Sequence, residues 1–185
     1  MKILAISGSL RASSINSAFC RAAAQLAPES MVVTVYNGLG DLPLFNPDLE
    51  EHPPSSVQCF REAVGSSDAL MIASPEYAHG VSGVIKNALD WLVSFEGVVA
   101  KPIALINTSS RAHHAQESLR EILKTMSTDI VAQASVVISL LGRCVTEEAM
   151  LASPDVCQAV TGVFEALSEH LASGIDIDDC AHADL

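Results

Sequence analysis

The feature that most constrains the fold is an alternation of short apolar runs with segments of helical periodicity. Four runs of branched or small apolar residues are typical of buried strands, at positions 2–7, 68–74, 102–107 and 130–138. A fifth run, at 31–36, alternates more and suits a strand nearer the sheet edge. Helical patterns occupy 16–26, 57–66, 82–95, 116–126 and 154–172. The resulting order βαβαβαβαβα predicts a parallel, doubly wound α/β sheet with right-handed crossovers.

The remaining sequence features predict a single domain with one long loop and a frayed C-terminal segment. A length of 185 residues, 49% of them hydrophobic, is enough for a single complete core. Residues 37–54 are rich in Gly and Pro, which predicts a long functional or partner-facing loop. This loop and the helix with Trp91 and Phe95 could form a subunit interface, or Trp91 could belong to the core. The acidic end at 175–185 is expected to fray, which leaves a domain of residues 1–174.

Charge and cysteine usage narrow the possible partners. A formal net charge of −12 argues against nucleic acid and against an anionic membrane surface, since both need a basic face. No apolar stretch approaches the length of a membrane span. Five widely spaced cysteines with no CxxC pattern favour reduced thiols in the cytoplasm over disulfides or a metal site. An anionic ligand would need hydrogen-bond donors in direct contact with it, because the field of the negatively charged chain repels it at longer range.

Ligands of an open parallel sheet bind beyond the carboxyl ends of the strands, so the loops there are the candidate sites. The first loop, residues 8–16 (GSLRASSIN), combines hydroxyls, one guanidinium and one amide directly before a helix. Such a loop can bind a phosphate through free N–H groups and the positive helix end. A simple helix cap is the alternative. The loop lacks the spacing of a nucleotide P-loop and of GxGxxG.

Two further loops carry polar groups at the same edge. Residues 74–83 (SPEYAHGVSG) could present backbone groups to a flat heteroaromatic ring, or could be a plain turn. Residues 108–114 (TSSRAHH) include adjacent histidines, which do not share a helix face and so argue against a metal site. These histidines are expected to face solvent or to pack on a ligand's rim. Hydrolysis by a Ser-His-Asp triad is disfavoured, because the sequence contains no GxSxG elbow.

Together, GSLRASSIN (8–16) and SPEYAHGVSGVIKNALDWL (74–92) resemble the NADPH-dependent FMN reductase family, which includes bacterial quinone, azo-dye and chromate reductases. The likeness extends through LREILKTM (119–126) to the final helix. The resemblance implies a flavodoxin-like, three-layer αβα fold with a five-stranded parallel sheet in the order 2-1-3-4-5. It also implies non-covalent FMN, with NADPH or NADH as co-substrate, in a homodimer or homotetramer.

The resemblance also assigns residues to the cofactor. The phosphate would be held by Ser9, Arg11, Ser14 and Asn16. The isoalloxazine would be lined, mainly through backbone groups, by Pro75, Glu76, Tyr77 and Ala78. The third side would be closed by Ser109, Ser110 and Arg111. The third loop departs from the family, which often has a glycine-rich run where this chain has RAHH at 111–114.

The implied activity is electron transfer from NAD(P)H through FMN to a small acceptor such as a quinone, flavin, azo dye or metal oxyanion. The cofactor carries this chemistry, so no catalytic side chain and no metal is expected. A flavodoxin-type electron carrier without its own NAD(P)H activity is the main alternative. Arg11 and the lack of sandwiching aromatics in the second loop argue against a carrier. A flavin-free interaction protein on the same scaffold is a third reading.

Overall fold

The computed structural model describes the backbone of residues 1–140 and 142–178, with side chains described as far as residue 174. Its centre is a parallel sheet in the order β2-β1-β3-β6-β7, with β8 also paired to β6. The strands are β1 (Lys2–Ser7), β2 (Val32–Tyr36), β3 (Ala69–Ala73), β6 (Pro102–Asn107), β7 (Asp129–Ile130) and β8 (Val136–Val137). Numbered by the predicted runs, this order is 2-1-3-4-5, so the flavodoxin-like arrangement is confirmed.

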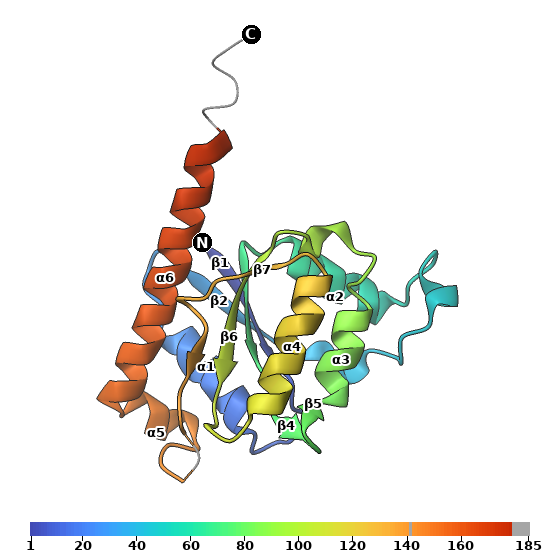
Figure 1. Cartoon of the computed structure of the whole chain (residues 1–185). Coiled ribbons are helices and arrows are strands. Elements are labelled where there is room, and N and C mark those ends of the chain that lie inside the picture. The colour runs from blue at the N-terminus through green and yellow to red at the C-terminus, as the bar shows by residue number, and fades with distance from the viewer. Residues whose placement is uncertain (141, 179–185) are drawn as a thin grey trace.

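Helices cover both faces of the sheet and complete the three-layer fold (Figure 1). One face is covered by α1 (Ile15–Leu26) and α6 (Pro154–Asp178), with the short α5 (Glu147–Leu151) beside them. The other face is covered by α2 (Ser55–Gly65), α3 (Gly83–Asp90) and α4 (His113–Thr125). Every residue of β3 is buried, because it lies mid-sheet between two apolar layers. No helix of the described residues is long and apolar enough to cross a bilayer.

The predicted strand at 130–138 is interrupted, and this is the largest departure within the sheet. The chain pairs with β6 only at β7 and β8, and it turns between them. The Ser135 hydroxyl donates to the Val131 carbonyl at 2.9 Å and accepts the Leu105 N–H at 3.1 Å. A side chain thus takes the place of a backbone acceptor in the ladder. The apolar pattern of the sequence does not indicate that a serine hydroxyl takes this place in the ladder.

Helix ends differ from the predicted ends where tertiary contacts intervene. Helix α3 stops at Asp90, and Arg61 Nε donates to the carbonyl of the next residue, Trp91, at 2.9 Å. Trp91 is fully buried, so the core interpretation of this residue is confirmed and the interface interpretation is wrong for it. At the chain end, α6 continues to Asp178, past the predicted end at 172. The remainder of the predicted tail, residues 179–185, lies outside the described residues.

The predicted long loop at 37–54 is anchored to α3. It contains two short 3₁₀ helices, η1 (Gly38–Asp41) and η2 (Pro47–Leu49). The Pro43 carbonyl accepts the Trp91 indole N–H at 2.8 Å and the Asn87 amide at 3.0 Å. Leu44, directly after this anchor, is 84% exposed. The loop is therefore held at its centre while presenting an apolar side chain outward.

Candidate functional site

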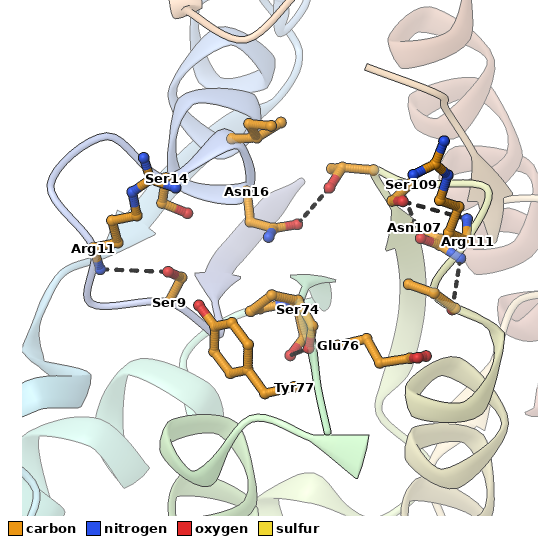
Figure 2. A pocket seen from close by; sticks show the side chains of 14 residues that line it. Ser9, Arg11, Ser14, Asn16, Ser74, Glu76, Tyr77, Asn107, Ser109 and Arg111 are labelled. Carbon is orange, nitrogen blue, oxygen red and sulfur yellow. Dashed lines mark hydrogen bonds between the residues drawn. The ribbon is translucent and has the colours of Figure 1, made fainter. Parts of the chain in front are cut away.

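A cavity of about 330 Å³ lies at the carboxyl edge of β1, β3 and β6, where the three predicted loops meet. Figure 2 shows their side chains around it. All predicted site residues line the cavity except Ala78 and Ser110. The lining consists of Ser9, Arg11, Ser14, Ile15, Asn16, Ser74, Pro75, Glu76, Tyr77, Asn107, Thr108, Ser109, Arg111 and Ala112. The sequence reasoning missed Ile15, Ser74, Asn107, Thr108 and Ala112.

The first loop combines a helix cap with free donors. The Ser14 hydroxyl accepts the Ser17 N–H at 3.2 Å, so the predicted cap of α1 is confirmed. Within the described residues, the N–H groups of Ala12, Ser13, Ile15 and Asn16 have no protein acceptor. Free N–H groups at the positive end of a helix are the donors that a phosphate needs. The cap and the anion site are therefore compatible with each other.

Gly8 allows the first and second loops to pack closely. A Cβ at this position would lie 2.4 Å from Ser74 Oγ and 3.1 Å from Ser82 Oγ. The Gly8 carbonyl accepts the Ser82 hydroxyl at 2.6 Å, and that same hydroxyl caps α3 by accepting the Ile85 N–H. The absence of a side chain at Gly8 thus lets the first loop lie directly against Ser74, which lines the cavity.

Two asparagines fix the third loop. Asn16 Oδ1 accepts the Thr108 hydroxyl at 2.9 Å, which ties the first loop to the third in a buried contact (Figure 2). Asn107 accepts the Ser109 N–H at 3.0 Å and donates to the Ala112 carbonyl at 3.0 Å. Polar residues at the carboxyl end of a buried strand were the available signal for Asn107 and Thr108. Their contacts are visible only in the folded sheet, where the loop after β6 reaches the loop after β1 across the end of β3.

The second loop forms a small hairpin, β4 (Glu76–Tyr77) with β5 (Gly80–Val81), that the sequence patterns did not predict. Glu76 Oε2 accepts the Ala115 N–H at 2.9 Å, in the first turn of α4. This contact explains why α4 begins at His113 and not at the predicted residue 116, since a carboxylate stabilises a helix N-terminus. Tyr77 lines the cavity and is 55% exposed. The Glu76 carboxylate is thus committed to α4, which leaves backbone groups of this loop for a ligand.

The third loop places a guanidinium at the cavity, and its histidines lie outside the lining. Ser109 Oγ accepts the Arg111 N–H at 3.3 Å, whereas Ser110 contacts Ser139, away from the cavity. His113 and His114 are exposed, as one of the two sequence interpretations predicted. Among the described residues, no group of three or more His, Cys, Asp or Glu could hold a metal ion.

Charge at the cavity favours an anion despite the acidity of the chain. Arg11 and Arg111 both line it, and neither lies within 4 Å of a carboxylate in the described part of the chain. Glu76 is the single carboxylate among the lining residues that the structure describes, and it is paired with α4. Two unpaired guanidinium groups and the free N–H groups of α1 therefore offer short-range donors to an anion in a chain whose net charge is −12.

Comparison with known proteins agrees with this geometry. The sequence model of NADPH-dependent FMN reductases matches residues 1–140, which include all three loops. The chain is 36% identical over 148 residues to an NAD(P)H-dependent FMN reductase of Pseudomonas aeruginosa, covering 75% of this chain and 78% of that protein. It is 35% identical over 131 residues to a quinone reductase of Escherichia coli, covering 66% and 69% respectively.

A solved structure supports the fold over nearly the whole chain. FerB, a flavoenzyme NAD(P)H:(acceptor) oxidoreductase from Paracoccus denitrificans, superposes with a TM-score of 0.72. The match covers 93% of this chain and 97% of FerB at 22% identity, so it bears on the fold alone. The family model and the curated relatives settle the family. This chain belongs to the NADPH-dependent FMN reductase family.

Proposed function

We propose that this protein is an FMN-dependent oxidoreductase that passes electrons from NADPH or NADH through bound FMN to a small acceptor. Acceptors of this kind include quinones, free flavins, azo dyes and metal oxyanions. The observation that carries the proposal is the cavity where the three loops meet, with free N–H groups and Arg11 at α1. Relatives named quinone reductase and NAD(P)H-dependent FMN reductase support the same activity.

The phosphate of FMN is assigned to the first loop. Ser9 and Arg11 supply side-chain donors, and the free N–H groups before and within the first turn of α1 supply the rest. Ser14 accepts from Ser17 but keeps its own hydroxyl proton to donate. Asn16 accepts from Thr108 through Oδ1, so its Nδ2 protons are available to the phosphate. Ser14 and Asn16 can thus serve the fold and the cofactor at once.

The flavin ring is assigned to the second and third loops. Pro75, Glu76 and Tyr77 line the cavity on one side, and Ser109 and Arg111 line it on another. Since the Glu76 carboxylate is occupied by α4, the second loop would contact the ring through its backbone. We assign no direct part to Ala78 or Ser110, the two predicted residues that do not line the cavity.

FMN, when bound, supplies the hydride and electron chemistry, and the chain supplies position and access. The roles left to the protein are to anchor the phosphate, to align the ring and to leave one ring face open. No catalytic acid or base is proposed. The Arg111 guanidinium can attract anionic groups of the co-substrate or acceptor to the open side, because it has no ion pair of its own among the described residues.

Purified protein loaded with FMN tests this function. We expect a flavin spectrum that bleaches with NADPH or NADH and steady turnover when a quinone is added. A protein that binds FMN but gives no turnover would be a flavodoxin-type carrier. A protein that takes up no FMN would be an interaction protein on the same scaffold. Either outcome would overturn the proposal.

We further propose a homodimer or homotetramer that resides in the cytoplasm and binds neither nucleic acid nor membrane. Two loops present exposed apolar side chains that a partner copy could cover: Leu10 in the first loop is 61% exposed and Leu44 in the long loop is 84% exposed. A net charge of −12 and free thiols at the described cysteines fit the other assignments. Sedimentation equilibrium tests the oligomer, for which a monomer at micromolar concentration is the contrary result.

The FMN-binding domain is proposed to comprise residues 1–174. Helix α6 belongs to it, because Val160, Phe164 and Leu167 are buried against the sheet. His170 also pairs with Asp129 of β7 at 2.6 Å. A chain truncated after residue 174 should retain FMN binding and cooperative unfolding, whereas a chain truncated at 153 should lose both.

A further inference from the structure

The tip of the β4–β5 hairpin adopts an unusual backbone for its residues. Tyr77 pairs with Gly80, so the turn consists of Ala78 and His79 alone. Both have positive φ, 49° and 58°, in the left-handed region that favours Gly or Asn. Two such residues in one turn are strained unless contacts elsewhere hold them. The hairpin forms one wall of the cavity, so whatever holds its tip also shapes the proposed flavin site.

The contact that holds the tip comes from α4. The His79 ring stacks on the His114 ring, with centroids 4.5 Å apart and an interplanar angle of 29°. Within the described chain, Ala78 and His79 make no hydrogen bond outside the hairpin. The base of the hairpin is secured independently, since Glu76 bonds the Ala115 N–H and Ser82 bonds the Gly8 carbonyl. The histidine stack is therefore the tip's own attachment.

We propose that His79 and His114 form a positioning pair that joins the hairpin to α4 and so aligns the cavity wall at residues 75–77 for the flavin ring. The alignment of the ring rests on the function proposed above, whereas the attachment of the hairpin does not. The ring of His114 provides the surface on which the turn at Ala78 and His79 rests.

Three variants isolate the pair. His114→Ala removes the stacking partner without altering the turn, and His79→Ala removes it from the other side. His113→Ala is the matched control. The His113 ring lies edge-on to the His114 ring, with centroids 6.0 Å apart, and it is not part of the stack. The first readout is hydrogen exchange of residues 76–81 in the protein without FMN. We expect His79→Ala and His114→Ala each to speed exchange there, and His113→Ala to leave it unchanged.

The second readout is the dissociation constant for FMN, measured by fluorescence titration. Each of the two stack variants should weaken binding by about twofold to tenfold, the range that an aromatic pair contributes. The double variant should be no weaker than either single variant, because both remove the same contact. His114→Phe, which restores a flat ring, should recover most of the protection and the affinity.

The proposed pair would be refuted if the two single losses of FMN affinity added up in the double variant. It would also be refuted if His113→Ala lost as much FMN affinity as His114→Ala. Failure of His114→Phe to restore protection would do so as well. If the wild-type protein failed to bind FMN, the proposed function would be wrong. The exchange experiment would then still decide whether the stack holds the hairpin. Changed exchange with unchanged FMN affinity would refute the positioning role, because the hairpin would then be held without consequence for the ligand.

Discussion

The close approach at Gly8 gives a prediction whose size can be worked from the structure. In Gly8→Ala the new Cβ would lie 2.4 Å from Ser74 Oγ and 2.9 Å from Ser74 Cβ, so one of the two loops must move. Overpacking of this kind costs about 1–3 kcal/mol. Displacing the Ser82 hydroxyl from the Gly8 carbonyl would remove a further 0.5–1.5 kcal/mol, roughly. We therefore expect the free energy of unfolding to fall by about 1.5–4.5 kcal/mol.

Urea denaturation measures that loss, and thermal unfolding gives an independent value. For a chain of this length, a loss of about 1.5–4.5 kcal/mol corresponds to a fall in Tm of about 3–18 °C. Because Gly8 is the first residue of the loop assigned to the phosphate, the affinity for FMN should fall as well. The effect on affinity should exceed the effect of equally destabilising changes at the opposite end of the sheet.

Two further variants make the test specific. Gly83→Ala is the control, because no atom lies within 4 Å of a Cβ at that position, and it should change stability by less than about 1 kcal/mol. Ser74→Gly removes the two nearest atoms that the new methyl group would meet and leaves only Ser82 Oγ, at 3.1 Å, so Gly8→Ala should be better tolerated in that background. The steric reasoning is refuted if Gly8→Ala and Gly83→Ala are equally stable, or if Ser74→Gly gives no relief.

Other predictions concern charge, capping and thiol reactivity. Arg11→Ala should weaken FMN binding by about tenfold, as expected for an exposed charge-assisted hydrogen bond, and unchanged affinity in a titration of apoprotein would exclude Arg11 from the phosphate site. Glu76→Gln should lower the free energy of unfolding by about 0.5–1 kcal/mol, because the carboxylate that meets the Ala115 N–H loses its charge; equal urea midpoints would contradict this. Burial raises the pKa of the Cys20 thiol to about 12, so Cys20 should resist a thiol reagent at pH 8 in the native protein while the exposed Cys59 reacts; labelling of both at the same rate would contradict the packing of α1.

The sequence specified the sheet well where burial alone decides the structure. The strands at 2–7 and 102–107 were predicted with their observed bounds, because continuous apolar runs in a parallel sheet are buried on both faces. The fifth strand was predicted less well. Its interruption depends on the Ser135 hydroxyl reaching across to β6, and an apolar pattern carries no trace of such a contact.

The site shows the same division between local and long-range information. The three loops were identified because their position after the strands follows from topology. The contacts within the site join residues far apart in sequence, such as Asn16 with Thr108 and Glu76 with Ala115. Spacing along the chain cannot reveal these pairs. The strained turn at Ala78 and His79 was also missed, because its residues are not those that such a turn usually contains.

The central claim is most directly tested by anaerobic titration of the FMN-loaded protein with NADPH, followed by a quinone. We expect about one equivalent of NADPH to bleach the visible flavin absorption and the quinone to restore it, over repeated cycles. Arg11→Ala, once saturated with FMN, should behave similarly, because Arg11 serves binding and not electron transfer. Stable flavin absorption in the presence of excess NADPH and NADH would contradict the proposed electron transfer.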